Sequence, residues 1–122
     1  LEGAHPILQE IAHEAIKVVD FSVLETHRGQ EAQDKAYSEG RSQMRFPWSQ
    51  HNTNPSSAMD LAPYPIDWED LERFVLLAGV IQAISFQLGY GDRIRWGGDW
   101  DRDGRMTDES FRDYPHFEIK VE

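Results

Sequence analysis

The sequence predicts an α+β fold, in which a small and mostly antiparallel sheet packs against helices. Three stretches have the apolar spacing or the end signals of helices, and four short runs have the composition of strands. The chain has 122 residues and no cysteine, which is enough for one domain with a core that needs no disulfide. Repeats and linkers are not visible, so we expect residues 1–122 to form a single domain.

The first half of the chain is predicted to alternate between helix and strand. Residues 6–19 begin with a proline at a suitable first helical position and carry apolar residues at helical spacing. A short strand is expected over residues 21–24. Residues 30–39 predict a polar helix that ends at Gly40. Residues 41–56 lack periodicity and are rich in proline, asparagine and serine, so they predict a loop.

The second half begins with a short buried strand, predicted over residues 57–62. The stretch "PIDWEDLERFVLLAGVIQAISFQLGYG" predicts the clearest helix, with Asp67 as its N-cap and a glycine after its last apolar turn. Apolar residues surround nearly its whole circumference, so we expect it to be the central helix of the core. Residues 93–96 and 116–121 predict two strands on either side of an acidic loop, 97–115.

The composition narrows the classes of partner. The chain has 22 acidic and 12 basic residues and a formal net charge of −10, which argues against nucleic-acid binding and favours divalent cations. Without cysteine, any metal must be held by histidine or carboxylates. The apolar runs are too interrupted to predict a membrane span, and no signal peptide is visible.

Two of the five histidines stand beside carboxylates at predicted strand or loop edges. His51, Asp60 and His116 can supply the three protein ligands of a catalytic zinc ion, with a fourth position left for water. The alternative is a histidine in a polar loop and a strand histidine that packs against Trp96. Structural or solvated roles are expected for the other three: His5, His13 and His27.

A second metal site is suggested by the acidic loop "DWDRDGRMTDES". Its aspartates alternate and are followed by Gly104, as an EF-hand type calcium loop begins. Ser110 stands at the twelfth position, where such loops have glutamate, and a solvated acidic turn is the alternative. The predicted calcium ligands are Asp99, Asp101, Asp103, Arg105 and Thr107.

The motifs "SQH…SAMDL" and "DYPHFE" resemble the zinc motifs of the M15 peptidases, which include D-Ala-D-Ala carboxypeptidases and dipeptidases and phage L-alanyl-D-glutamate endopeptidases. "HRGQEAQ" is similar to their arginine followed by glutamine five residues later. "RWGGDW" ahead of "PHFE" is similar to a signature of the endopeptidase branch. The resemblance covers nearly the whole chain and implies the Hedgehog and DD-peptidase type of fold. His51 and Asp60 are nine apart here and usually seven apart in the family, a difference that costs little closure entropy.

The resemblance also implies roles for individual residues. Asp113, three residues before His116, is expected to be the general base, with a turn aspartate as the alternative. Arg28 is expected to hold the developing oxyanion or a substrate carboxylate. Gln33, a further candidate for substrate binding, is expected to brace Arg28. For Ser49 a substrate hydrogen bond and a turn contact both remain open.

The function implied by the resemblance is a zinc-dependent peptidoglycan endopeptidase of phage-lysin type. Such an enzyme cleaves the L-Ala–D-Glu bond of cell-wall stem peptides, and we expect a monomer that acts from the host cytoplasm once the membrane is breached. Zinc, Arg28 and Arg95 would supply the positive charge for an acidic peptide. The alternatives are a D-Ala-D-Ala carboxypeptidase or dipeptidase, and a non-catalytic calcium-binding or wall-binding module.

Overall fold

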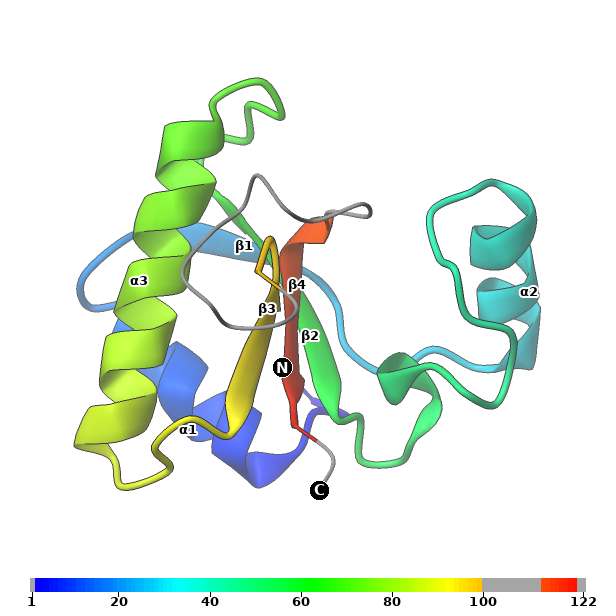
Figure 1. Ribbon diagram of the computed structural model, residues 1–122, viewed down its shortest axis with the longest axis horizontal. Coiled ribbons are helices and arrows are strands. Elements are labelled where there is room, and N and C mark those ends of the chain that lie inside the picture. The colour runs from blue at the N-terminus through cyan, green and yellow to red at the C-terminus, as the bar shows by residue number, and fades with distance from the viewer. Residues whose placement is uncertain (1, 100–112, 121–122) are drawn as a thin grey trace.

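A four-stranded antiparallel sheet organises the protein (Figure 1). The structure, a computed structural model, describes residues 2–99 and 113–120. In spatial order the strands are β1 (Phe21–Glu25), β2 (Ala58–Pro63), β4 (Asp113–Ile119) and β3 (Ile94–Gly97). The helices are α1 (Pro6–Ala15), α2 (Gln30–Ser38), α3 (Leu71–Gln87) and the short 3-10 helix η1 (Gln50–Asn52). The predicted α+β class is confirmed.

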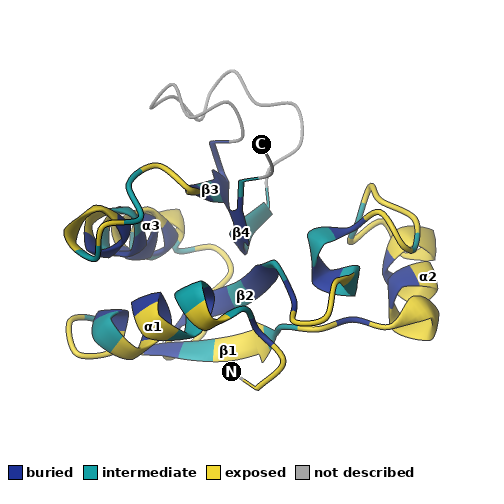
Figure 2. Cartoon of the chain, turned by 90° about the horizontal axis from the view of Figure 1, so that it is seen from below, coloured by how far each residue is buried: buried dark blue, intermediate teal, exposed yellow. Residues whose placement is uncertain are grey.

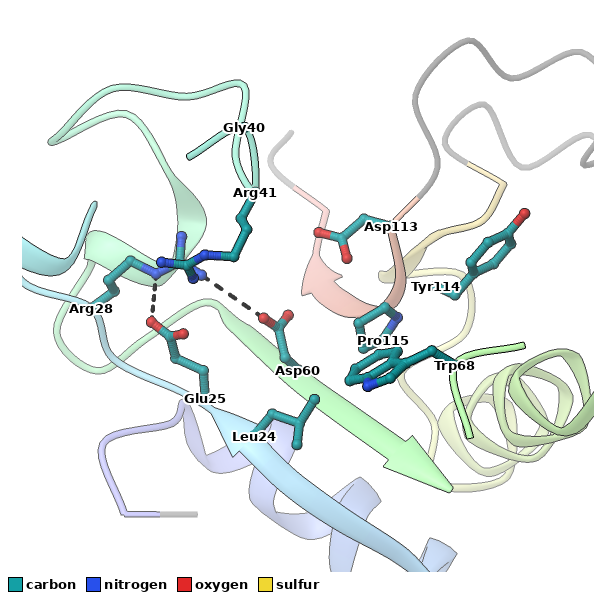
Figure 3. A pocket seen from close by; sticks show the side chains of 10 residues that line it. All are labelled: Leu24, Glu25, Arg28, Gly40, Arg41, Asp60, Trp68, Asp113, Tyr114 and Pro115. Carbon is teal, nitrogen blue, oxygen red and sulfur yellow. Dashed lines mark hydrogen bonds and ion pairs between the residues drawn. The ribbon is translucent and has the colours of Figure 1, made fainter. Parts of the chain in front are cut away.

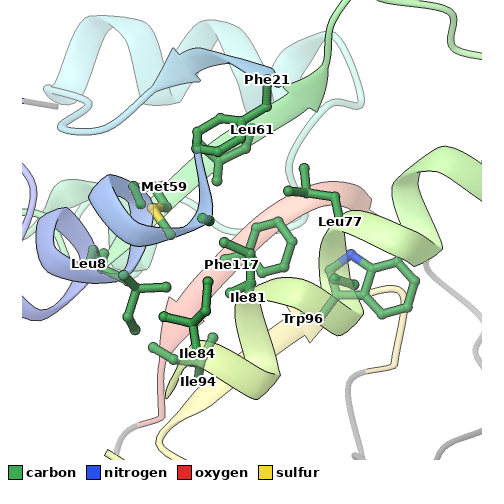
Figure 4. Close-up of a cluster of buried hydrophobic side chains, with 14 of the residues drawn as sticks. Leu8, Phe21, Met59, Leu61, Leu77, Ile81, Ile84, Ile94, Trp96 and Phe117 are labelled. Atoms are coloured by element: carbon green, nitrogen blue, oxygen red, sulfur yellow. The ribbon is translucent and has the colours of Figure 1, made fainter. Parts of the chain in front are cut away.

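The hydrophobic core lies between one face of the sheet and helices α1 and α3, while α2 lies on the other side of the molecule (Figures 1 and 2). Successive strand residues point to opposite faces. Met59, Leu61 and Phe117 are fully buried in this core (Figure 4), so Asp60 and His116 are directed away from it. The alternation in the two central strands therefore places polar groups on the face opposite the core.

Helix α3 covers the core but is not surrounded by it. Phe74, Leu77 and Ile81 are buried, whereas Leu76 and Phe86 are 60% and 64% exposed. The expectation of a central helix was wrong because a single small sheet covers one side of α3 and leaves its opposite side to solvent. None of the helices in the described part of the chain has the length and apolar character needed to cross a membrane.

Two helix ends differ from the prediction. Helix α1 stops at Ala15, because the amides of Val18 and Val19 both donate to the Ala15 carbonyl in a turn that leads into β1. Helix α3 begins at Leu71 rather than after Asp67. The carboxylate of Asp67 accepts a hydrogen bond from the amide of Glu69 at 3.0 Å, so it closes a separate turn before the helix.

Candidate metal centre and active site

Three side chains from distant parts of the sequence meet on the polar face of the sheet. His51 belongs to η1, and Asp60 and His116 are paired residues on β2 and β4. Opposite residues of an antiparallel pair point to the same face, which brings the last two together. Asp60 Oδ1 lies 3.1 Å from both His51 Nε2 and His116 Nδ1, and these two nitrogens are 3.2 Å apart. The predicted group is therefore assembled despite the longer loop between His51 and Asp60.

The outer nitrogens of both imidazoles are held by acceptors. His51 Nδ1 donates to the carbonyl of Thr26 at 2.6 Å, and His116 Nε2 donates to Glu118 Oε1 at 2.7 Å. Because neither acceptor oxygen can donate, the outer nitrogen is the one that keeps its proton when each ring is neutral. Each ring then turns a lone pair toward Asp60, as metal-binding histidines do.

The spacing of these three atoms fits a small divalent cation. In a tetrahedral site with bonds of about 2.0–2.1 Å, ligand atoms are about 3.3 Å apart. The observed separations of 3.1–3.2 Å are close to that value. Two lone pairs and a carboxylate oxygen at this distance repel one another unless positive charge lies among them. The three residues can thus hold a metal ion and leave one position open.

Protonation competes with a metal ion for the same atoms. Burial by itself would lower the pKa of His116, but hydrogen bonds to Asp60 and Glu118 outweigh it and raise the pKa to about 9. Burial would raise the pKa of Asp60, yet hydrogen bonds from His116 and His51 hold it well below its usual range. A cation must therefore displace a proton from His116, which makes its binding weaken in acid.

Glu118 supports His116 from behind and was not predicted from the sequence. Its side chain is almost fully buried, and Arg95 Nη2 donates to Glu118 Oε2 at 2.6 Å. Burial opposes ionisation of Glu118, but the contacts with His116 and Arg95 lower its pKa. The signal in the sequence is the spacing His-x-Glu in a strand, which puts both side chains on one face. Arg95, expected to supply charge to the cleft, is instead engaged with Glu118.

Asp113 lies beside the same centre. Its Oδ2 is 3.9 Å from His116 Nδ1. Residues three apart point to opposite faces of a regular strand, but here the register shifts between Trp96 and Gly97, which pairs with Asp113. A Cβ atom on Gly97 would lie 2.1 Å from the Asp113 carbonyl oxygen, so glycine is required for this close approach. The irregular pairing turns Asp113 toward His116.

The protonation of Asp113 suits proton transfer near neutral pH. Burial and, to a smaller extent, the negative charge of Asp60 together raise the pKa of Asp113 to about 6. Arg28 and the imidazoles of His116 and His51 act on the pKa of Asp113 in the opposite direction. A carboxylate with such a pKa can accept a proton and release it again.

Arg28 lies at the edge of the group and is firmly held. It is 6% exposed, and it donates from Nε to Glu25 at 2.5 Å and from Nη1 to Gln33 Oε1 at 2.8 Å. Its Nη2 is 3.8 Å from Asp60 Oδ2. The expected contact between Gln33 and Arg28 is thus present, and Gln33 is fully buried. Ser49 caps η1, where its hydroxyl accepts from the amide of His51 at 3.2 Å.

A cavity of about 420 Å³ opens over these groups (Figure 3). Asp60 and Asp113 lie in its middle, with arginines on one side and aromatic residues on the other. The lining residues are Leu24, Glu25, Arg28, Gly40, Arg41, Asp60, Trp68, Asp113, Tyr114 and Pro115. The size and the mixed lining suit a short peptide.

Of the five predicted calcium ligands, Asp99 is the one within the residues that the structure describes. Asp99 is buried, and its amide donates to the carbonyl of Trp96 at 3.1 Å. Asp101, Asp103, Arg105 and Thr107 lie outside the described residues. Calcium binding therefore stays a prediction from the sequence.

The chain is similar to known proteins over most of its length. A family model described as phage L-alanyl-D-glutamate peptidase matches residues 1–120. The chain is 32% identical over 115 residues to the L-alanyl-D-glutamate peptidase of Escherichia phage T5. This match covers 89% of this chain and 81% of the phage T5 protein. The crystal structure of the Serratia marcescens L-Ala D-Glu endopeptidase ChiX is similar with a TM-score of 0.76 and 26% identity. That similarity covers 97% of this chain and 81% of the other.

Proposed function

Because the chain belongs to the phage L-alanyl-D-glutamate peptidase family, we propose that it is a zinc peptidase that hydrolyses the L-Ala–D-Glu bond of cell-wall stem peptides. The observation that supports zinc is the convergence of His51, Asp60 and His116, with both imidazoles oriented by acceptors behind them. Nitrogen and carboxylate ligands in a three-residue set are typical of catalytic zinc. The adjacent cavity would receive the peptide.

In this mechanism each residue has a defined task. Zinc held by His51, Asp60 and His116 would supply Lewis acidity toward the peptide carbonyl and toward water. Asp113 takes the proton from the attacking water molecule and passes it to the nitrogen of the leaving amine. Its raised pKa allows both transfers. Glu118 keeps the proton of His116 on Nε2, so that Nδ1 remains a ligand atom.

Arg28 contributes positive charge next to the reacting carbonyl. Glu25 and Gln33 fix its guanidinium in place. The guanidinium therefore does not have to move when negative charge develops on the carbonyl oxygen. Because these contacts hold it 3.8 Å from Asp60, it also stabilises the ionised form of that ligand. Ser49 and Gln33 are proposed to act from within the protein, by holding η1 and Arg28 in place.

The proposal is tested by the products of a defined substrate. Incubation with a synthetic stem peptide that contains both an L-Ala–D-Glu bond and a D-Ala–D-Ala terminus should release L-alanine at its free amino end, as seen by mass spectrometry. Removal of zinc with a chelator should stop the release, and added zinc should restore it. Release of terminal D-alanine would show the carboxypeptidase activity instead, and an intact peptide would favour a binding module.

Further parts of the proposal concern the setting of the reaction. The substrate would be bacterial peptidoglycan, reached from the host cytoplasm after the membrane is breached, and the protein would act as a monomer without binding nucleic acid or membranes. The net charge of −10 supports the absence of binding to nucleic acids and membranes, because nucleic acids and anionic lipids repel such a surface. Calcium at residues 99–110 is proposed as a second cation.

Glu118 offers a test of how the metal ligand is held. In Glu118→Gln the amide oxygen can still accept the hydrogen bond from His116, but the charge is lost and Arg95 loses its carboxylate partner. We expect zinc affinity to fall about 10-fold to 100-fold, as measured by competition with a chromophoric chelator. The matched control is Glu72→Gln on the exposed surface of α3. Equal zinc affinity in Glu118→Gln and the parent would show that Glu118 has no part in positioning His116.

A further inference from the structure

The cavity over the metal centre has two chemically different ends (Figure 3). Arg28 and Arg41 lie at one end, and Trp68, Tyr114 and Pro115 at the other. Asp60 and Asp113, which mark the place of the reaction, lie between them. A peptide whose scissile bond lies at the centre therefore meets cationic groups on one side and an apolar wall on the other.

The two arginines at the cationic end are not equivalent. Arg28 is buried, and its guanidinium is shared among Glu25, Gln33 and Asp60. The charge of Arg28 is matched by Glu25, which also lines the cavity. Arg28 is therefore fixed beside Asp60 and cannot leave these partners cheaply to bind a second carboxylate at the end of the cavity.

Arg41 is free to change partners. Its side chain is 52% exposed and pairs with Glu39, itself 46% exposed, at 2.8 Å. Glu39 does not line the cavity, whereas Arg41 does. An exposed pair of this kind contributes little to stability, so a ligand carboxylate can replace Glu39 at small cost. Arg45, in the same loop, is engaged with the ring of Tyr37 at 4.7 Å and is not among the lining residues.

The substrate class has the matching polarity. Glutamate is a dicarboxylic residue, so one carboxylate remains even when the peptide continues through the other. Alanine on the opposite side of the bond is small and apolar. We infer that Arg41 binds the free carboxylate of the D-Glu residue, and that the L-Ala side lies against Trp68 and Pro115. This inference rests on the proposed function and fixes the direction in which the peptide occupies the cavity.

The test compares two synthetic L-alanyl-D-glutamyl peptides that differ in one group. One carries the free carboxylate of D-Glu and the other the corresponding carboxamide. The parent enzyme should cleave the carboxylate peptide with a kcat/KM about fivefold to tenfold higher, through a lower KM. Arg41→Gln should remove this preference, while Arg41→Lys should keep part of it. Arg45→Gln, an arginine of the same loop, is the control and should behave like the parent.

Two more variants separate this role from a general loss of activity. Glu39→Gln releases Arg41 from its present partner, so it should lower the KM of the carboxylate peptide and leave the carboxamide peptide unchanged. Trp68→Ala should raise the KM of both peptides alike, because the L-Ala side is common to them. An unchanged preference in Arg41→Gln, or no preference in the parent, would overturn the inference while the proposed function stands. A parent enzyme that cleaves neither peptide would contradict both.

Discussion

Replacing Asp113 with asparagine should lower kcat by about 10²-fold to 10⁴-fold, the range typical of a lost general base. Asparagine has nearly the same shape but cannot take the proton of water, so the substrate KM should change little. Zinc content should stay at the parent level, because Asp113 is 3.9 Å from His116 and is not one of the three converging ligands. Steady-state kinetics and metal analysis of the same preparation measure both quantities.

The matched control for this variant is Asp34→Asn, which removes the same charge from the exposed surface of α2. It should leave kcat unchanged. If Asp113→Asn keeps full activity, Asp113 is not the base and its proximity to His116 has another cause. If zinc is lost together with activity, Asp113 is better described as a fourth ligand.

The second large effect is expected at the metal centre itself. His51→Ala removes one of three ligands, and we expect a loss of zinc affinity greater than the 10-fold to 100-fold typical of outer contacts, with activity lost at micromolar zinc. His51 lies in η1 and not in a strand, and the Thr26 carbonyl that it bonds also accepts from Ser56 Oγ at 3.0 Å, so the sheet should stay folded. Competition with a chromophoric chelator gives the affinity, and circular dichroism checks the fold.

An exposed histidine on α1 provides the comparison for this experiment. His13→Ala should bind zinc and cleave the stem peptide like the parent. Parent-like zinc affinity in folded His51→Ala would be incompatible with the proposed ligand set. Restoration of the activity of His51→Ala by millimolar zinc would agree with it, since a weakened site fills at higher concentration.

The three residues of the converging group were predicted from their residue types and from the resemblance of the surrounding motifs to those of a zinc peptidase family. His51, Asp60 and His116 stand in short segments whose order and residue types match a zinc ligand set, and the β2 and β4 pairing then joins two of them. Glu118 was missed because its role depends on the spacing His-x-Glu within β4, a short pattern that is not specific to metal sites. The turn of Asp113 toward His116 likewise depends on a shift at Gly97.

The limits of the prediction for α3 have a different physical cause. Apolar residues such as Leu76 and Phe86 predict burial, but burial depends on what else the fold brings near them, and here a four-stranded sheet covers one side. Asp67 is a residue type that favours the N-cap position, yet its carboxylate accepts a hydrogen bond within a separate turn before the helix. Arg41 was not noticed in the sequence because a lone arginine in a loop carries no pattern, and its place in the cavity is a property of the assembled structure.

The pairing of Asp60 with His116 gives the cation a part in defining the fold. Sliding β2 past β4 by one residue would exchange the two faces of the strand, carrying Met59 or Leu61 into the polar cleft and the carboxylate into the core. Only the native alignment presents both ligands to one ion. Zinc that binds both residues would therefore stabilise only the native alignment of two strands that are distant in sequence. Slipped forms of the sheet would not gain this stabilisation.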